Sequence, residues 1–389
     1  MKNIIIIGSK GYKAEYGGWE TFVTNLIDNY HNNDTIFYIP EITDQKNKSE
    51  YKIKNVWAKP IYTKKLGSIT MMLFVFKAVL YYQKKIKKEK LDNVIMYILG
   101  CRVGPLFSLI HKKLNKMGVT IMINPDGLEW KRAKWNSLIK MYFKLSERTM
   151  IKSSNYVICD SKAILEYVNN KYRKYNVNTN FIAYGAYLKK SSSDKKVEEF
   201  YQKNNIQKDN YYLFVGRFVP ENNIEIIIKE FMKTSIKKDL VIVSNVVHNN
   251  FYKKLLLETN FLSDSRIKFV GSVYDDTILR YIREYATAYI HGHSAGGTNP
   301  SLLEAFSITK INILYDVVYN REVGLDAALY FNQKEDSLKE ILEKVEQFDL
   351  DTKNKYGEMA KKRIEDDYTW ELVAFRYQNL FDKIIRSKV

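Results

Sequence analysis

The feature that most constrains this chain is an alternation of short apolar runs with longer helical stretches, which occurs twice. In the first half, β-branched and apolar runs occupy residues 4–7, 35–39, 93–99, 119–124 and 155–160. In the second half, similar runs occupy residues 211–216, 239–245, 266–272, 288–292 and 311–316. Unbroken apolar strands separated by helices are typical of a parallel sheet with helices on both faces. The sequence therefore predicts an α/β chain with two doubly wound domains in tandem.

The polar stretch 189–200 is the best candidate for the junction between these domains. We therefore expect one domain at residues 1–190 and a second at 191–368. Residues 369–389 form a third segment, in which apolar side chains recur at three- and four-residue spacing after Thr369. This spacing predicts a C-terminal amphipathic helix. Paired α/β domains bind ligands in the crevice beyond the carboxyl ends of their strands, so we expect the functional residues between the two halves.

The charge of the chain is concentrated in its first half. The whole chain carries a formal charge of +18, whereas residues 1–190 contain 33 Lys and Arg against 14 Asp and Glu. This distribution indicates a polyanionic partner for the N-terminal half, either nucleic acid or an anionic membrane surface. Only two cysteines are present, Cys101 and Cys159, so a disulfide scaffold is excluded and a reducing compartment is favoured.

The longest apolar stretch, residues 69–82, falls short of the roughly 20 residues that cross a bilayer. Five lysines follow it between positions 84 and 90. Two interpretations fit this pattern equally well. One is a helix that lies in a membrane interface, and the other is a core helix with a solvated basic end.

Glycines surround the turn after the first apolar run, at Gly8, Gly11, Gly17 and Gly18. Glycine lets a backbone approach a ligand closely, and the helix expected to begin at Trp19 or Glu20 offers N–H groups to an anion. The spacing matches neither the GxGxxG nor the GK[ST] fingerprint, which counts against hydride transfer and ATP hydrolysis. A tight packing turn is the simpler alternative.

A second motif follows the fourth apolar run, where Asp126 and Glu129 stand beside Trp130, Lys131 and Arg132. A carboxylate at the end of a strand can accept hydrogen bonds from sugar hydroxyls or act as a base, and an aromatic ring can stack on a sugar. The alternative is a helix-capping Asp followed by a solvated charged run.

Two further motifs lie in the second half. Arg217 directly follows the apolar run 211–216, where a guanidinium can clamp a phosphate. The polar loop before Glu304 leads into a helix with Asn299 as its expected cap. We expect the N–H groups of Ser301 and Leu302 to be free for a diphosphate, and Glu304 to hold a ribose diol. His291 and His293 are expected on opposite sides of a strand without a third ligand, so no metal site is expected.

These motifs together resemble those of the family 4 glycosyltransferases, which have the GT-B fold of two facing Rossmann-like doubly wound domains with a C-terminal helix crossing back. More narrowly, they resemble bacterial β-1,4-rhamnosyltransferases of capsular and cell-wall polysaccharide synthesis. The segments that carry the resemblance are GSKGYKAEYGGWETFV at 8–23, NPDGLEWKRAKW, PENN, SAGGTNPSLLEAF and NREVG at 320–324.

The resemblance implies a nucleotide-sugar donor site in the C-terminal domain and an acceptor site in the N-terminal domain. The implied catalytic residues are Asp126, Arg217 and Glu304. The implied donor-binding residues are Gly17, Gly18, Arg217, Gly297, Thr298, Asn299, Ser301, Leu302 and Glu304. The implied acceptor-binding residues are Tyr16, Gly17, Gly18, Trp19, Asp126, Glu129, Lys131 and Arg132.

Two departures from the family pattern bear on the donor. The family carries a motif with two Glu residues, and the position of the first Glu is occupied by Gly296 here. The Lys that usually accompanies the phosphate-binding Arg is also absent, and residues 221–223 stand near its place. Losing a contact to a sugar hydroxyl is compatible with a 6-deoxy sugar such as L-rhamnose. Arg217 and helix N-termini would then neutralise the diphosphate, with Lys131 or Arg321 as helpers.

The resemblance therefore implies a retaining, metal-independent transferase that moves L-rhamnose from dTDP-L-rhamnose to an undecaprenyl-diphosphate-linked saccharide. Such an enzyme would be cytoplasmic and peripheral on the inner face of the cell membrane, with the basic half on anionic lipid and no nucleic acid bound. Four alternatives remain open: transfer of another nucleotide-activated hexose, a nucleotide-sugar epimerase or phosphorylase, a basic nucleic-acid-binding module, and a degenerate transferase.

Overall fold

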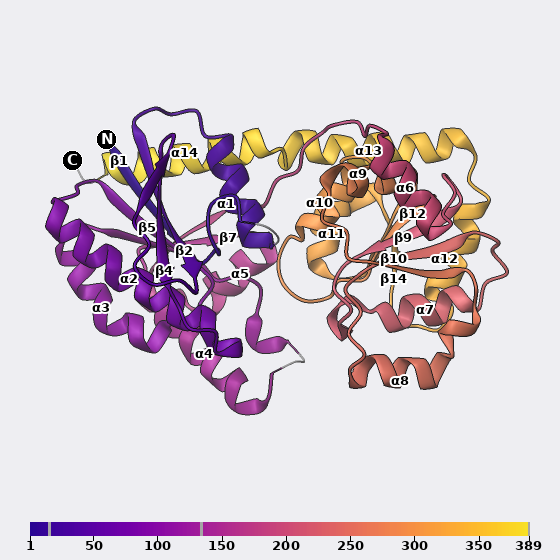
Figure 1. Cartoon of the computed structure of the whole chain (residues 1–389), viewed down its shortest axis with the longest axis horizontal. Coiled ribbons are helices and arrows are strands. Elements are labelled where there is room, and N and C mark those ends of the chain that lie inside the picture. Colours follow the sequence, from indigo (N-terminus) through magenta and orange to yellow (C-terminus); the bar gives the residue numbers. More distant parts are fainter. Residues whose placement is uncertain (15–16, 133–134, 388–389) are drawn as a thin grey trace. The chain divides into compact units, whose positions relative to one another are not determined.

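A computed structural model describes residues 1–14, 17–132 and 135–387 of the chain (Figure 1). The chain divides into two compact units, and each has a mainly parallel sheet covered by helices on both faces. The first unit comprises Met1–Tyr184 together with Trp370–Val389, and the second comprises Gly185–Thr369. The predicted α/β class with two doubly wound domains is confirmed.

The sheet of the first unit has eight strands within the described residues. They are β1 (Lys2–Ile7), β2 (Thr35–Thr43), β3 (Tyr51–Ile53), β4 (Val56–Tyr62), β5 (Val94–Leu99), β6 (Thr120–Asn124), β7 (Tyr156–Cys159) and β8 (Asn178–Phe181). Their order is β3-β4-β2-β1-β5-β6-β7-β8. Every residue of β5 and β6 is buried, because helices cover both faces of these central strands.

Six helices of this unit flank the sheet in the part of the chain that the structure describes. They are α1 (Gly18–Asp28), α2 (Thr70–Glu89), α3 (Gly104–Lys116), α4 (Ser137–Lys152), α5 (Lys162–Lys171) and α14 (Trp370–Arg386). In Figure 1, α2, α3 and α4 lie below the sheet, and α1 and α14 lie above it. The C-terminal helix α14 belongs to the core of this unit, because the hydroxyl of Tyr377 lies 2.9 Å from that of Tyr97 on β5.

Helix α2 is the element for which the sequence left two interpretations open. Its apolar side chains Phe74, Val75, Ala78, Val79 and Tyr82 are buried within the first unit. It is therefore a core helix with a basic end, and the membrane-interface interpretation of this stretch is wrong for its apolar face. None of the helices within the described residues combines the length and the apolar character that crossing a bilayer requires.

The second unit has a six-stranded sheet, counted over its described residues, in the order β11-β10-β9-β12-β13-β14. The strands are β9 (Tyr211–Val215), β10 (Asp239–Val243), β11 (Ile267–Gly271), β12 (Ala288–His291), β13 (Asn312–Tyr315) and β14 (Leu329–Phe331). The helices are α6 (Lys195–Asn204), α7 (Ile224–Met232), α8 (Asn250–Thr259), α9 (Asp276–Glu284), α10 (Pro300–Phe306), α11 (Val318–Gly324), α12 (Ser337–Glu346) and α13 (Leu350–Asp367). One buried cluster joins the sheet to α7, α8 and α12, and another joins it to α6 and α9.

All ten apolar runs noted in the sequence are strands, with ends that shift by a few residues. Four edge or near-edge strands were not predicted, and these are β3, β4, β8 and β14. Strand β4 contains Lys59 and Pro60, and β8 is the polar sequence NTNF, so neither shows an apolar run. These strands need less apolar character because they lie at or next to the sheet edges.

Candidate functional site

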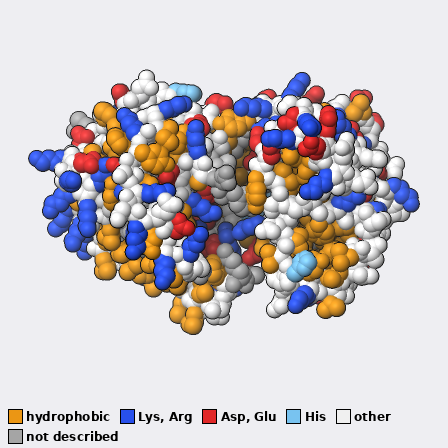
Figure 2. Space-filling model, in the orientation of Figure 1, with side chains coloured by type: hydrophobic (Ala, Val, Ile, Leu, Met, Phe, Trp, Pro, Cys, Tyr) orange, Lys and Arg blue, Asp and Glu red, His pale blue; other side chains and the backbone are white. Residues whose placement is uncertain are grey.

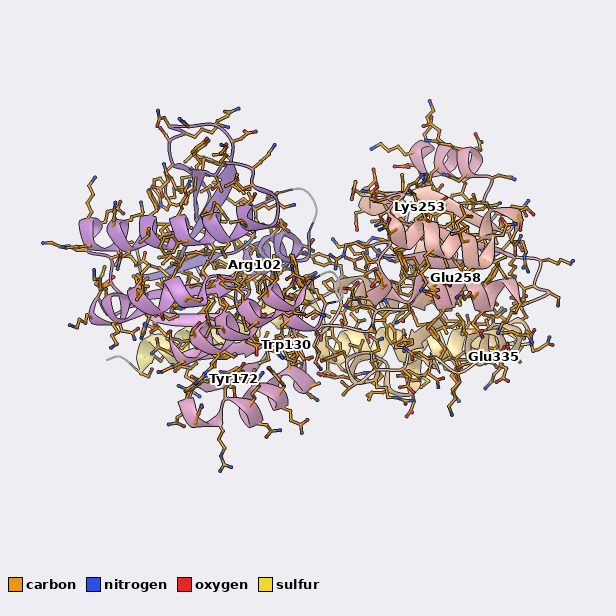
Figure 3. The ribbon with its side chains drawn as sticks, turned by 90° about the horizontal axis from the view of Figure 1, so that it is seen from below. Arg102, Trp130, Tyr172, Lys253, Glu258 and Glu335 are labelled. Atoms are coloured by element: carbon orange, nitrogen blue, oxygen red, sulfur yellow. The ribbon has the colours of Figure 1, made fainter. Side chains whose placement is uncertain are left out.

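A pocket lies in the first unit at the carboxyl ends of β5 and β6, which are neighbours in the sheet. Its lining residues are Gly100, Cys101, Arg102, Pro125, Asp126, Glu129, Trp130, Phe143 and Glu147. Arg102 and Trp130 are labelled in Figure 3. Three of the lining residues are carboxylates, so this sheet edge offers acceptors for hydroxyl groups. The structure thus brings Asp126, Glu129 and Trp130 together, as the sequence motif predicted.

Asp126 has a left-handed backbone with φ of 62°, a conformation that Asp adopts more readily than most residues. Two hydrogen bonds fix this turn: the N–H of Asp126 donates to Oδ1 of Asn124 at 2.7 Å, and the N–H of Gly127 donates to Oδ1 of Asp126 at 2.9 Å. Burial raises the pKa of Asp126, and the nearby guanidinium groups of Arg132 and Arg102 oppose that rise. The turn therefore holds a carboxyl group with a raised pKa at the pocket.

Glu129 is restrained by its own neighbours in the motif. It accepts a hydrogen bond from Nε1 of Trp135 at 2.9 Å and pairs with Nε of Arg132 at 2.9 Å. Arg132 also lies 4.0 Å from Asp126, so one guanidinium serves both carboxylates. Arg132, which was predicted to bind the acceptor, therefore also stabilises this motif by pairing with its two carboxylates.

Trp130 is held by Glu147, a buried residue that the sequence analysis missed. Glu147 accepts hydrogen bonds from Nε1 of Trp130 at 3.2 Å, from the Tyr167 hydroxyl at 2.6 Å and from the Tyr172 hydroxyl at 2.5 Å. Trp130 and Tyr172 are both labelled in Figure 3. Because this carboxylate comes from the middle of α4, only the tertiary structure reveals that it fixes the indole ring.

Lysines surround the Trp130 ring. The ammonium groups of Lys144, Lys171 and Lys131 lie 4.6, 5.0 and 5.6 Å from its centroid. Ammonium groups at such distances are attracted to the negative face of an indole. Lys131, which the sequence analysis assigned to the acceptor, is therefore part of a cationic cluster around this ring.

The glycine loop after β1 is organised by Glu20 rather than by its glycines alone. Glu20 is buried, and its Oε1 accepts a hydrogen bond from the N–H of Lys10 at 2.7 Å. A Cβ on Gly17 would lie 1.7 Å from Oε2 of Glu20, so glycine is required there. Helix α1 begins at Gly18, one residue earlier than expected, and a Cβ at Gly18 would meet nothing within 4 Å.

Trp19 packs edge-on against Tyr184 with ring centroids 6.0 Å apart, so it supports the loop from within this unit. Tyr16, another predicted acceptor contact, lies outside the described residues. The structure therefore places Gly17, Gly18 and Trp19 at one helix start and leaves the prediction for Tyr16 as it was.

In the second unit, Arg217 follows β9 at the carboxyl edge of the sheet and is exposed. The turn beneath it is fixed by Asn222, whose side-chain amide donates to the carbonyl of Arg217 at 2.7 Å. Within the described residues, no ion pair is formed by Arg217. A cation in this position is available to an anionic ligand.

Strand β12 pairs with β9 and ends at the same carboxyl edge of the sheet. Its last residue, His291, is buried. Burial lowers the pKa of His291 well below its usual range, and neighbouring His293 lowers it further, so this ring is neutral at physiological pH. Its Nε2 is buried without a hydrogen-bond partner among the described residues. His291 and His293 have ring centroids 6.1 Å apart, so the expectation that they point to opposite sides is wrong. Residues two apart on a strand would share a face, and here the strand ends at His291, so His293 lies in the loop that follows.

Glu304 of α10 is paired with Arg283, which the sequence analysis also missed. Nη2 of Arg283 lies 2.7 Å from Oε2 of Glu304 and donates to Oγ of Ser301 at 3.2 Å. Arg283 is buried, whereas the side chain of Glu304 is 39% exposed. Because one face of the carboxylate stays open, Glu304 is oriented by Arg283 and still accessible to a hydroxyl-bearing ligand.

The loop before α10 corrects one prediction. Asn299 caps the helix as expected, but its Oδ1 accepts the N–H of Ser301 at 2.9 Å, and its carbonyl accepts the N–H of Leu302 at 3.1 Å. These two N–H groups are therefore not free, because the capping residue that starts the helix also uses them. Gly296 and Gly297 precede this turn, and Thr298 is buried in it.

Arg321, expected as a helper for the diphosphate, is already engaged. It binds Asp316 through Nε at 2.5 Å and through Nη2 at 2.8 Å. In the parts of the chain that the structure describes, no group of three or more His, Cys, Asp or Glu side chains is arranged to hold a metal ion.

Each unit matches a known family model. Residues 196–363 match the family described as Glycosyl transferases group 1, and residues 1–187 match a Domain of unknown function (DUF1972). Residues 196–363 form a glycosyltransferase domain. Arg217, His291 and Glu304 all lie within it.

One relative and two solved structures are similar to nearly the whole chain. An uncharacterized glycosyltransferase of Methanocaldococcus jannaschii is 23% identical and covers 99% of this chain and 100% of its own. Sucrose-phosphate synthase from Thermosynechococcus elongatus has a TM-score of 0.79 at 15% identity, covering 100% of both chains. Anabaena HepE in complex with UDP and glucose has a TM-score of 0.72 at 11% identity, covering 98% of this chain and 100% of its own. The fold is that of GT-B glycosyltransferases.

Proposed function

We propose that this glycosyltransferase moves L-rhamnose from dTDP-L-rhamnose to a saccharide carried on a lipid diphosphate such as undecaprenyl diphosphate. The donor would bind the second unit, and the acceptor would bind the pocket of the first unit. The observation that carries the proposal is the carboxyl edge of the neighbouring strands β9 and β12, where an exposed Arg217 follows β9 and a neutral, buried His291 ends β12. An exposed guanidinium at this edge of the sheet suits a diphosphate leaving group.

Arg217 would stabilise the charge that develops on the diphosphate as the bond to the sugar breaks. Glu304, oriented by Arg283, would accept hydrogen bonds from the ribose hydroxyls. With Arg217 as the neutralising group, we propose a reaction that needs no metal ion. Attack would occur from the face of the departing phosphate, which would take the acceptor proton and retain the anomeric configuration.

The pocket of the first unit would hold the acceptor sugar. Trp130 provides an aromatic face, and Asp126 and Glu129 provide carboxylates around it. This combination of a ring and carboxylates is suited to a sugar, which has an apolar face and a hydroxyl rim. Asp126 would orient the acceptor hydroxyls and would not form a covalent bond to the donor.

Gly296 supports a donor that lacks one hydroxyl contact. It occupies the position at which the family 4 glycosyltransferases that this sequence resembles carry the first Glu of their motif, so no carboxylate side chain projects there. L-Rhamnose is a 6-deoxy sugar and needs one hydroxyl contact fewer. The second candidate is UDP-glucose, which is favoured by the similarity to Anabaena HepE in complex with UDP and glucose.

The test is sugar transfer from a panel of nucleotide sugars to a lipid-diphosphate glucose acceptor, with EDTA present and the product mass recorded. A mass gain of one deoxyhexose from dTDP-L-rhamnose alone is expected. A hexose gain from UDP-glucose would support the second candidate and remove rhamnose. Dependence on added divalent metal would contradict neutralisation by Arg217 alone. Conversion of the donor without an acceptor would indicate an epimerase.

A further inference from the structure

Helices α3 and α4 each expose a stripe of large apolar side chains. On α4, Leu138, Met141 and Leu145 recur at three- and four-residue spacing, which places them on one side of the helix. On α3, Leu106 and Leu109 do the same. The exposed fractions are 76% for Leu109, 72% for Leu138 and 64% for Met141. Such a gathering of exposed apolar side chains indicates a surface that contacts a partner.

Each stripe continues into cations on the same side of its helix. Lys113 and Lys116 follow on α3, and Arg148 and Lys152 follow on α4. We call these five apolar and four basic residues the α3–α4 face. Figure 2 shows hydrophobic and basic side chains mixed over the part of the first unit that α2, α3 and α4 cover.

Acidic side chains are nearly missing from this layer. Helices α2, α3 and α4 contain twelve Lys and Arg but only two Glu, which are Glu89 and Glu147. Glu147 is buried, and Glu89 is paired with Lys85 at 3.0 Å. The exposed charge around the apolar stripes is therefore positive.

The α3–α4 face adjoins the candidate acceptor pocket through α4 itself. Phe143 and Glu147 of α4 line the pocket, and Met141 and Leu145 each precede them by two residues, which places the exposed stripe on the other side of the same helix. Both helices follow strands whose carboxyl ends form the pocket edge, so their apolar first halves lie toward that edge. A partner on this face would be close to a sugar in the pocket.

We propose that the α3–α4 face docks on a lipid bilayer that contains anionic headgroups. The leucines and the methionine would enter the headgroup boundary, and the lysines and arginine would bind lipid phosphates. The inference rests on the proposed function, because it names the surface from which a lipid-linked acceptor reaches the pocket. A second copy of this chain is a poorer occupant, since pairing this face with itself sets like charges against one another.

The experiment is co-sedimentation of the full-length protein with vesicles of phosphatidylcholine, with or without phosphatidylglycerol, in the absence of any sugar donor. The test variant combines L109Q, L138Q and M141Q, and the matched control is L257Q, which changes an 87% exposed leucine of α8 in the second unit. The test variant should lower the vesicle partition coefficient at least about tenfold, because three apolar side chains no longer enter the interface. The control should bind like the wild type.

A second variant, K113Q with K116Q, separates the basic contribution. It should weaken binding to phosphatidylglycerol vesicles and leave the weak binding to phosphatidylcholine unchanged. Circular dichroism and the melting temperature report whether each variant folds. Wild-type binding by the folded L109Q/L138Q/M141Q variant would overturn the proposal. So would a change from dimer to monomer in sedimentation without a change in vesicle binding, which would make a second copy the occupant.

A separate transfer assay distinguishes failure of the proposed function from failure of the membrane-docking proposal. Transfer to a short-chain, water-soluble acceptor should be the same in the wild type and in the L109Q/L138Q/M141Q variant, because the pocket residues are unchanged. If no sugar donor supports transfer, the vesicle measurement still decides whether the α3–α4 face binds lipid. If transfer to the soluble acceptor occurs and vesicle binding is unaffected by the substitutions, only the surface assignment fails.

Discussion

The two units build different electrostatic environments at the same place in the same kind of sheet. In the first unit, the carboxyl ends of β5 and β6 collect the carboxylates of Asp126, Glu129 and Glu147. In the second unit, the carboxyl ends of β9 and β12 present Arg217 and a neutral His291. A parallel sheet determines where a ligand binds, and the side chains after each strand determine which ligand that is.

The two environments also differ in how their charges are held. Glu129 and Glu147 accept hydrogen bonds from fixed indole and hydroxyl groups, so the carboxylates are rigid before any ligand arrives. The side chain of Arg217 is exposed, whereas its backbone carbonyl accepts hydrogen bonds from the Asn222 side chain and from the N–H of Val219. A rigid carboxylate pocket suits recognition of a sugar, whereas an accessible cation suits charge that appears during the reaction.

The largest expected effect tests the cation of the second unit. Arg217→Ala should lower kcat for sugar transfer by about a hundredfold to a thousandfold, since a preorganised charge at the leaving group is lost. Arg321→Ala is the control, because its guanidinium already binds Asp316 through two hydrogen bonds. We expect at most a fewfold change for that control. Equal losses in the two variants, measured in steady-state kinetics, would contradict the special position of Arg217.

The next effect tests the rigidity of the first unit. Glu147→Gln places an amide NH2 group against Trp130 or against the two tyrosine hydroxyls, so one donor loses its acceptor. The free energy of unfolding should fall by about 1–3 kcal/mol, and kcat/KM for the acceptor should fall about tenfold. The dissociation constant of the nucleotide should stay the same. Glu343→Gln, an exposed change on α12, should alter none of these values.

A loss of nucleotide affinity in Glu147→Gln would remove the contrast between the two sites. Denaturant unfolding and calorimetric titration with the nucleotide measure the two quantities separately. A variant with normal stability but a raised KM for the acceptor would still place Trp130 at the acceptor.

The strand pattern and several site residues were predictable because they follow local rules. Buried parallel strands need unbroken apolar runs, and residues just after such runs must lie at the ligand-binding edge, which located Asp126 and Arg217. Asn299 was recognisable as a helix cap from its place before Pro300. The same cap consumes the N–H of Ser301, a consequence that depends on the rotamer of one side chain.

The missed residues act through partners distant in sequence. Glu147 meets Trp130 across 17 positions, and Arg283 meets Ser301 across 18, so neither pairing leaves a mark in the local sequence. The exposed leucines of α4 were also missed, because an apolar stripe predicts a buried face unless the fold shows which side faces the sheet. The roles of Glu147, Arg283 and the exposed leucines all depend on tertiary packing and not on the propensity of the local sequence.

Arg283 provides a smaller test of the second unit. Arg283→Met keeps most of the buried volume but leaves Glu304 and Ser301 without their guanidinium partner. The nucleotide affinity should fall about fivefold, equivalent to about 1 kcal/mol, because Glu304 is no longer oriented. Isothermal titration with the nucleotide measures the change, and kcat should change little.

The matched control for this test is Arg280→Met on the same helix, where the guanidinium binds Asp276 at 2.8 Å. The nucleotide affinity of this variant should equal that of the wild type. Arg283→Lys should restore part of the lost affinity, since a lysine can still reach Glu304 with a single charge. If Arg283→Met lowers kcat and leaves the affinity unchanged, Arg283 does not act by orienting Glu304.

The smallest change in rate at neutral pH is expected for Asp126→Asn. The side chain can still accept hydrogen bonds, and Asn tolerates the left-handed backbone with φ of 62° at this position. We expect about a threefold loss in kcat/KM for the acceptor, since one charged hydrogen bond becomes a neutral one. The pH profile should change more than the rate itself.

Burial raises the pKa of Asp126 above its ordinary value of 3.8, so the native state holds this proton more tightly than the unfolded state does. The contribution of Asp126 to the free energy of unfolding therefore falls as the pH rises from its unfolded to its folded pKa. At neutral pH, Asp126→Asn should be at least as stable as the wild type. In the wild type, activity should fall as the pH drops through the raised pKa, and that acid limb should be missing from Asp126→Asn. An unchanged acid limb in the variant would assign the titration to another group and leave Asp126 as a turn-forming residue.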